Sequence, residues 1–559
     1  MLKGEKTATL KLRLLHTYNR PLSFATWYYP FFLAAVTAGF WALPSRLRLW
    51  FVIGASLFFY AFWDVRFCAL LIAAAASDYL CSNAYEGPPP AWARVFSVGM
   101  APAAWLALAG LVKPVAPSHI AFAAAGALGF CILFFAASRL DAQSRRRWLV
   151  LLGVCVNLGI LAFFKYANWF SEGLQDLLQH FGASADGVVL DILLPVGLSF
   201  HTFQSIAYIV DVSQGRCKAE PSFWRVLCMI TFFPQLVAGP IERAARMLPQ
   251  LRFQSRFDWR VLAWGLHLLL IGYVLKVFVA DNCAVVADYY FKTVHEGGSL
   301  GMGWALAATG AYAAQIYGDF VGYSYIARGS ATLLGVELTR NFELPLLSRS
   351  PGEFWRRWHI SLSTWIRDYL FLPLSLSLSY RNQDPASGKP IVDDRLIVSS
   401  CLIATMLLAG LWHGADWHYV AFGGFHGILQ VLWIVVPGAA LLSSAPGVLP
   451  IVLSRALTFA LVCIAWILFR SESMGDAMQV LATLGGVSGP GAAVPRGVLL
   501  WLALHAVPLL LLIFAVRSDA EEADIAKRPG AVLAVCYFLM FVMLATSEAG
   551  RAQFIYFQF

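Results

Sequence analysis

Charged residues are scarce in this sequence. They make up 13% of its 559 residues, whereas hydrophobic residues make up 59%. A soluble globular protein has about 25% charged and roughly 45–50% apolar residues, so this composition excludes an ordinary cytosolic enzyme, a disordered protein and a collagen-like fibre. The apolar residues form many runs of about 20, long enough to cross a bilayer as helices, without the alternation of an outer-membrane barrel. The sequence predicts an all-α, polytopic membrane protein with about 11–14 transmembrane helices.

Several motifs of familiar enzymes are also missing. The ten cysteines form no CxxC pair, and most lie within apolar runs, so neither a zinc site nor a disulfide framework is indicated. The sequence contains no G-x-S-x-G elbow, P-loop or H-E-x-x-H motif. Their absence argues against an α/β-hydrolase, a P-loop NTPase and a zinc protease. Carboxylates at ligand spacing do not accompany the histidines, so we predict no metal site.

The positive charge has a topological explanation. The net charge is +9, but the arginines sit in short clusters between apolar runs, as in cytoplasmic loops of membrane proteins. No basic stripe with interleaved aromatic residues indicates a nucleic-acid partner. The cluster from Arg139 to Arg147 predicts a cytoplasmic loop in a bacterial cytoplasmic (inner) membrane. Residues 1–22 form a basic N-terminal extension that makes a poor signal peptide, and we assign it no role.

One apolar segment, residues 224–240, does not read as a straight span. It contains FFPQLVAGP, with two prolines and a glycine, and basic residues flank it on both sides. A kinked re-entrant segment explains this pattern better. Irregular backbone at membrane depth is tolerated only where it is buried in protein or lines a cavity, so we expect the bundle to enclose one.

Residues 351–374 carry more charge than a membrane segment should. Their period predicts a helix over 353–370 with an aromatic face and a polar face. The aromatic face carries Trp355, Trp358, Leu362, Trp365, Ile366 and Tyr369. The polar face carries Arg356, Ser363 and Arg367, with His359 beside them. An interfacial helix anchored by its tryptophans is an open alternative, but it does not account for His359.

A second polar cluster follows a long apolar run. His413 ends the run just before Gly414, and Asp416, His418 and His426 come after it. A helix must end near Gly414, which leaves His413 close to freed carbonyl groups. For His418 and His426 the simpler interpretation is a core histidine with a hydrogen-bond partner. Ionisable groups in membrane segments mark functional sites by default, and a neutral imidazole is a natural general base.

At these residues the sequence resembles the membrane-bound O-acyltransferase superfamily and, within it, the integral membrane subunits of alginate O-acetylation. The resemblance covers most of the chain from about residue 23, and we take 23–559 as one transmembrane acyltransferase domain. The matching stretches are LPVGLSFHTFQSIAYIVDV (194–212), FFPQLVAGPIER (232–243), YGDFVGYSYIARGSATLLG (317–335), NFELPLLSRSPGEFWRRWHISLSTWIRDYLFLPL (341–374), LLAGLWHGADWHYVAFGGFHG (407–427) and FIYFQF (554–559).

The resemblance implies a multi-helix fold with re-entrant segments and a tunnel through the membrane. His413 matches the superfamily's near-invariant histidine, which we interpret as the general base. His359 matches the second active-site position, where we expect it to bind or polarise the acyl carbonyl with support from Arg356 or Arg357. Tyr317 and Asp319 are candidate tunnel-lining residues that bind substrate. They could equally be helix-packing groups.

The predicted function is membrane O-acyl transfer. The resemblance implies that an acetyl group passes from a cytoplasmic thioester, acetyl-CoA or another acyl thioester, with no bound cofactor. The acceptor is a hydroxyl of an extracytoplasmic acetyltransferase partner or of an alginate- or cellulose-like exopolysaccharide. D-alanyl or other acyl transfer to a cell-wall polymer is an alternative. A proton-coupled transporter or flippase is an alternative from another class, although no inverted repeat is visible.

Overall fold

The computed structural model describes residues 24, 26, 28–111, 115–181, 192–237, 239–383, 390–487, 491–515 and 530–547. Within these ranges the chain forms helices and no β-strand, apart from one isolated bridge between Gln383 and Pro390. The predicted all-α class is therefore confirmed. The basic extension 1–22 and the closing motif 554–559 lie outside the described residues.

The helices follow one another along the chain in three groups. The first group is α2 (Tyr29–Ala42), α3 (Ser45–Asp64), the 3₁₀ turn η1 (Val65–Phe67), α4 (Cys68–Glu86), α5 (Trp92–Gly99), α6 (Ala101–Ala109), α7 (Pro117–Ser138) and α8 (Ala142–His180). The middle group is α9 (Leu198–Ser213), α10 (Phe223–Thr231), α11 (Phe233–Leu236), α12 (Ala244–Gln250), α13 (Trp259–Tyr273), the π-helical η2 (Val274–Ala280), α14 (Asp281–His295) and α15 (Met302–Leu333).

The remaining elements include the polar segments singled out above. They are η3 (Pro345–Leu347), α16 (Pro351–Arg357), α17 (Ile360–Ile366), the π-helical η4 (Arg367–Phe371), α18 (Leu372–Arg381), α19 (Asp394–His413), α20 (Trp417–Val435), α21 (Pro437–Ser444), α22 (Val448–Arg470), α23 (Met474–Leu484), α24 (Arg496–Ala515) and α26 (Gly530–Ala545).

Eight helical stretches in the described part of the chain are long and apolar enough to cross a membrane. Two shorter apolar helices, at Tyr29–Ala42 and Arg496–Leu509, approach this length. The 32-residue α15 is about 48 Å long but more polar. The lower end of the predicted range of 11–14 is reached if these three cross as well. Large apolar side chains such as Phe122 in α7 point outward (75% exposed), as expected of a surface that meets lipid.

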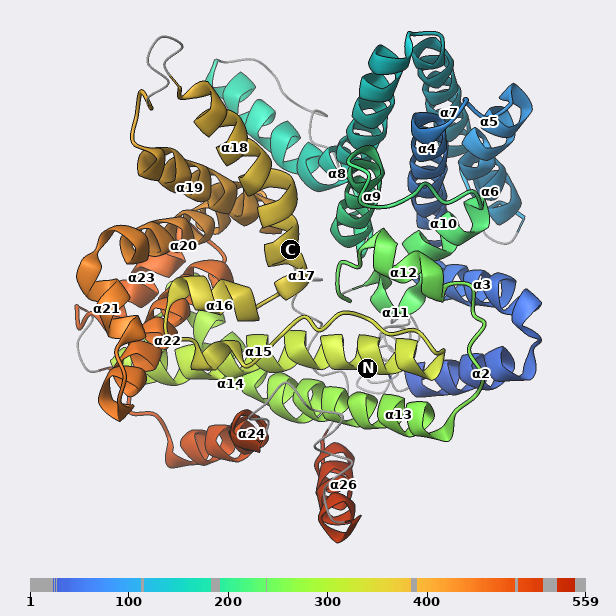
Figure 1. The fold of residues 1–559 in the computed structure, drawn as a ribbon. Coiled ribbons are helices and arrows are strands. Elements are labelled where there is room, and N and C mark those ends of the chain that lie inside the picture. The colour runs from blue at the N-terminus through green and yellow to red at the C-terminus, as the bar shows by residue number, and fades with distance from the viewer. Residues whose placement is uncertain are drawn as a thin grey trace, which may run out of the picture.

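Two helical groups flank a central layer (Figure 1). The helices α4, α7, α8 and α9 stand together at one end, and α19, α20 and α22 lie at the other. The long helices α13 and α15 run side by side beneath them and pack closely against each other. The short helices α16 and α17 lie between α15 and the α19–α22 group. This arrangement places α16 and α17, which carry much of the polar segment 351–374, between the two groups.

The segment 224–240 is a broken helix, in keeping with its predicted kink. Helix α10 ends at Thr231, the backbone of Phe232 leaves the helical region (φ −52°, ψ 104°), and α11 restarts at Phe233 with Pro234 in its first turn. These residues are buried, and α10 packs against α3 and α4. The freed backbone is therefore enclosed by protein, as irregular backbone at membrane depth requires.

Candidate active site

His359 and His413 line the same small cavity. Eight other residues complete its wall. Two are aliphatic, Ile316 and Leu362, and six are aromatic, namely Phe320, Trp355, Trp358, Phe422, Trp466 and Phe469. These residues come from α15, α16, α17, α19, α20 and α22 and from the junction of α16 and α17. The volume of about 20 Å³ holds about one water molecule. Two segments that are far apart in the sequence therefore bring two imidazoles to one nearly dry space.

His359 reaches this cavity because the helix around it is broken. The predicted continuous helix over 353–370 is wrong: α16 ends at Arg357 and α17 begins at Ile360. His359 between them has left-handed backbone angles (φ 44°, ψ 54°). On an unbroken helix it would lie beside Arg356 on the polar face. The break instead turns it toward the side of Trp355 and Trp358.

Backbone strain at His359 is offset by hydrogen bonds from a neighbouring loop. A non-glycine residue in the left-handed region costs about 1–3 kcal/mol. The carbonyl of Asn341 accepts from the N–H of Ile360 (2.9 Å), and its side-chain Oδ1 accepts from both the N–H (3.0 Å) and the hydroxyl (2.9 Å) of Ser361. The hydroxyl of Ser361 also accepts from the N–H of Ile241 (3.0 Å). Strain held in place this way is typical of functional positions.

The imidazole of His359 sits among aromatic rings. Its ring centroid lies 5.0 Å from that of Phe320, 6.1 Å from Phe200 and 6.2 Å from Phe342. The side chain is 1% exposed, and neither ring nitrogen has a hydrogen-bond partner within the described ranges. Buried polar groups are normally hydrogen-bonded, so this imidazole is available to hydrogen-bond a ligand.

His413 is the last residue of α19. Its ring packs against Trp412, Phe422 and Phe469, with centroids 4.6, 5.7 and 5.1 Å away. The next residue, Gly414, is extended (φ −167°), and a Cβ there would come within 2.2 Å of the Tyr419 ring. Glycine therefore lets α20 fold back tightly against the end of α19. The predicted helix end near Gly414 is confirmed.

His418 and His426 contact other protein groups. The Nδ1 of His418 donates to the backbone carbonyl of Leu468 (2.9 Å), and the Nδ1 of His426 accepts from the indole N–H of Trp355 (3.2 Å). Both side chains are buried, and neither lines the cavity. The interpretation of these two residues as core histidines agrees with these contacts.

The other predicted site residues do not line the cavity. Arg356 is exposed, while Arg357 pairs with Glu353 (2.9 Å) and donates to the carbonyl of Glu343 (3.2 Å). Asp319 is 1% exposed and binds the ammonium of Lys276 (2.7 Å). Tyr317 on the same helix is also buried, but only its neighbours Ile316 and Phe320 reach the cavity wall. The contacts of Asp319 fit its helix-packing interpretation, and a substrate role for these four residues stays a prediction.

Two residues near the histidines were not singled out in the sequence. Lys165 of α8 donates to the backbone carbonyl of His413 (3.1 Å), and a lone lysine inside the apolar run 147–170 was the signal. His201 of α9 is 3% exposed, and neither of its ring nitrogens has a partner in the part of the chain that the structure describes. It follows Phe200, which stacks on His359. Within the described ranges no three His, Cys, Asp or Glu residues are grouped to hold a metal ion.

The model of the MBOAT, membrane-bound O-acyltransferase family matches residues 218–384 of the chain, which include His359. A probable alginate O-acetylase of Azotobacter vinelandii is 32% identical over 458 residues, which cover 81% of this chain and 76% of the relative. The chain belongs to the membrane-bound O-acyltransferase family. The resemblance stated from its motifs is thereby confirmed.

Two further relatives carry related names. A probable alginate O-acetylase of Pseudomonas aeruginosa is 38% identical over 343 residues, which cover 60% of each protein. A peptidoglycan O-acetyltransferase of Helicobacter pylori is 28% identical over 474 residues, covering 80% of this chain and 75% of the relative. The similar sequences thus include proteins named for the O-acetylation of two different polysaccharides.

Proposed function

We propose that this protein is an O-acetyltransferase of the bacterial cytoplasmic membrane that acts through His413 and His359. The observation that carries the proposal is the shared cavity, in which two buried imidazoles from distant segments meet among aromatic side chains. Family membership and the names of the relatives support acyl transfer rather than transport. A transporter would not need an unpartnered imidazole at a strained backbone position in a space that holds about one water.

The proposed reaction moves an acetyl group from a thioester, such as acetyl-CoA, to a hydroxyl. The hydroxyl oxygen attacks the thioester carbonyl carbon, so a C–O bond forms as the C–S bond breaks. A ring nitrogen of His413 takes the hydroxyl proton and passes it to the departing thiolate, which leaves as a thiol. A positioned base of this kind contributes about 10²–10⁴ in rate.

The role proposed for His359 is to stabilise the negative charge on the carbonyl oxygen. A neutral imidazole has one N–H donor and one acceptor nitrogen. A donor fixed in advance toward the oxyanion, in a site without bulk water, stabilises it more strongly than water does. The aromatic wall supports this role because it excludes water and surrounds the ring on several sides. The hydrogen bonds between Asn341 and the residues after His359 fix the backbone that orients the His359 imidazole.

The acceptor we propose is a hydroxyl of an extracytoplasmic polysaccharide or of a partner acetyltransferase that passes the group on. The relatives are named for alginate and peptidoglycan O-acetylation, which favours acetyl over D-alanyl transfer for this chain. The donor is cytoplasmic in this scheme, so the acyl group crosses the membrane through the predicted tunnel. The loop from Arg139 to Arg147 then faces the cytoplasm.

The test uses purified full-length protein in lipid nanodiscs with acetyl-CoA that carries a labelled acetyl group. Partly deacetylated alginate is offered as acceptor, and label in the polymer is measured after the free thioester is removed. The proposal predicts label in ester linkage, and it predicts a loss of about 10²–10⁴ for His413→Ala and for His359→Ala. Transfer at the normal rate by either variant would refute the assignment.

A matched control separates catalysis from folding. His267 in α13 is also a buried histidine, its Nδ1 contacts the hydroxyl of Tyr537 (3.0 Å), and it does not line the cavity. The variant His267→Ala should retain transfer within a few-fold, and His418→Gln should do the same. If the control variants lost activity as completely as His413→Ala, the losses would report damaged folding rather than a catalytic pair.

A further inference from the structure

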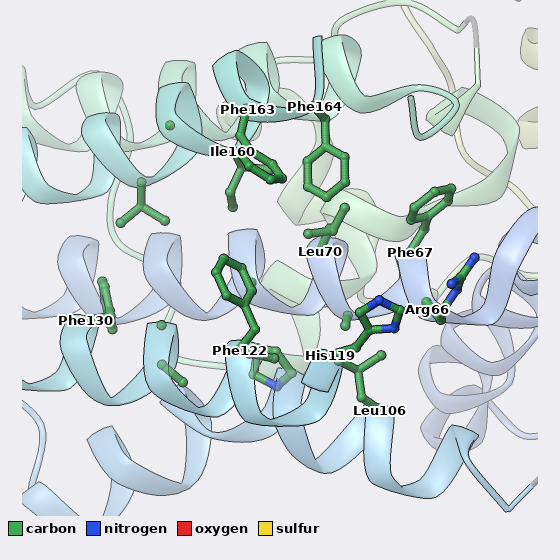
Figure 2. Close-up of a pocket in the computed structure, with 18 of the residues that line it drawn as sticks. Arg66, Phe67, Leu70, Leu106, His119, Phe122, Phe130, Ile160, Phe163 and Phe164 are labelled. Carbon is green, nitrogen blue, oxygen red and sulfur yellow. The ribbon is translucent and has the colours of Figure 1, made fainter. Parts of the chain in front are cut away.

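A second, much larger cavity lies among the N-terminal helices, and His413 does not line it. Its volume is about 700 Å³, within the range of about 300–1,000 Å³ of small-molecule sites. Its walls come from α4, α7 and α8, with contributions from α5, α6, η1, Ile192 and Leu193 (Figure 2). All three main helices belong to the stretches that qualify as membrane spans. The cavity therefore lies among helices that are long and apolar enough to cross the membrane.

The lining is apolar along its length and polar at one end. Phe122, Phe130 and Phe163 extend along the apolar part, whereas Arg66 and His119 lie near each other at the opposite end from Phe130 (Figure 2). Phe122 is 75% exposed and Phe163 47% exposed, so the cavity opens between α7 and α8 toward the surroundings of the protein. A ligand that fits must have a long apolar body and one polar end.

Small residues create the space. The wall contains Ala69, Ala73, Ala76, Gly99, Ala123, Gly126, Ala127 and Gly159. Within the part of the chain that the structure describes, a Cβ added at Gly126 or Gly159 would meet nothing within 4 Å. These two glycines are therefore not required for close helix packing, and their missing side chains leave room that neighbouring helices do not fill.

We propose that this cavity binds one phospholipid of the bilayer, with an acyl chain among the phenylalanines and its phosphate at Arg66 and His119. Asp64 engages Nε and Nη2 of Arg66, and the guanidinium carries further N–H donors on Nη1. The side chain of Arg66 is 41% exposed. His119 is exposed in the first turn of α7, at the end of the helix whose dipole favours an anion. The cavity opens to the bilayer, so a lipid can enter sideways.

The lipid site is independent of the proposed reaction. The predicted topology indicates which leaflet of the bilayer would supply the lipid. Arg139 follows the last turn of α7 and belongs to the predicted cytoplasmic loop. The polar end of the cavity lies at the other end of α7, so the phosphate would belong to the outer leaflet. Loss of the lipid site would leave the case for His359 and His413 untouched, because neither lines this cavity.

The test is photochemical labelling of the full-length protein in nanodiscs with phosphatidylglycerol that carries a diazirine near the end of one acyl chain. Peptide mass spectrometry then locates the label. We expect preferential labelling of the cavity walls in α4, α7 and α8. Unlabelled phosphatidylglycerol should compete about tenfold better than diacylglycerol, which lacks the phosphate. Label spread evenly over all bilayer-facing helices, or equal competition by diacylglycerol, would overturn the proposal.

Variants that fill the cavity sharpen the test. The double substitution Gly126→Leu with Gly159→Leu places side chains in the empty space and should lower cavity labelling about tenfold. Gly129→Leu is the matched control, because Gly129 lies on α7, has nothing within 4 Å of an added Cβ in the described structure, and does not line the cavity. His119→Gln should weaken competition by phosphatidylglycerol but not by diacylglycerol. Unchanged labelling in the double variant would contradict the assignment, and the competition with unsubstituted protein decides the matter if that variant fails to fold.

Discussion

The ammonium of Lys165 in α8 lies 3.1 Å from the backbone carbonyl oxygen of His413. The hydroxyl of the next residue, Tyr166, donates to the carbonyl of Leu411 (3.0 Å). Carbonyl groups in the last turn of a helix have no intrahelical partner, so α8 supplies the missing donors at the end of α19. Helix α8 thus fixes the end of α19, which carries the proposed catalytic base, although no residue of α8 lines the cavity.

Replacing Lys165 should slow the reaction without preventing folding. Lys165→Met removes a charged donor whose hydrogen bond is worth about 1.5–3 kcal/mol, and the end of α19 becomes free to shift. We expect kcat to fall about tenfold or more while KM for the thioester stays within a few-fold. Lys165→Arg keeps a cation within reach and should recover part of kcat. Full activity in Lys165→Met would show that this contact does not position His413.

The close packing of α19 against α20 predicts a stability effect at Gly423. A Cβ at Gly423 would come within 2.1 Å of the backbone carbonyl oxygen of Met406, so the two helices would have to separate. Overpacking of this kind typically costs about 1–3 kcal/mol. Gly423→Ala should therefore lower the unfolding temperature in detergent. Gly438→Ala in α21, where an added Cβ meets nothing within 4 Å of the described atoms, is the control and should leave it unchanged.

Buried charges in the π-helical region predict a larger effect. Lys276 in η2 binds Asp281 and Asp319, with both N···O distances 2.7 Å and all three side chains at most 2% exposed. Lys276→Met leaves two buried carboxylates without their cation, and breaking a buried pair costs about 3–5 kcal/mol. We expect a strong fall in folded yield and unfolding temperature. Lys292→Met, which removes an exposed pair with Glu296, should change stability by about 0.5 kcal/mol at most. Equal behaviour of the two variants would refute a structural role for the buried cluster.

The sequence was sufficient for the helical class and the family, because long apolar runs and the motifs around His359 and His413 are local features. The catalytic roles of these two histidines stay predictions. The sequence was not sufficient for the path of the chain at His359. The period of residues 353–370 fits a continuous helix well, and only the contacts of Asn341 with Ile360 and Ser361 explain why the helix breaks. Those contacts join the loop at Asn341 to the helix around His359, and the hydrophobic period of one helix gives no information about contacts with another segment.

The same limit applies to the charged candidates. Arg357 was singled out because charge is costly in a membrane, and Asp319 because it lies in a motif of the family. The structure gives each a protein partner, in Glu353 and Lys276. The pair of Lys276 with Asp319 depends on how η2 packs against α15, which a linear pattern does not contain, whereas Arg357 and Glu353 are four residues apart on α16. Lys165 was overlooked for the same reason, since its contact with His413 connects residues 248 positions apart.

The measurement that tests the central claim most directly is a double-mutant cycle on the transfer rate, with His359→Ala, His413→Ala and the double variant in the same nanodiscs. If the two imidazoles act on one reacting group in one cavity, their effects are strongly non-additive. The account predicts that the double variant is hardly slower than the slower single variant. If the double variant is slowed by the product of the two single losses, the histidines act independently, and the account of a shared catalytic centre is contradicted.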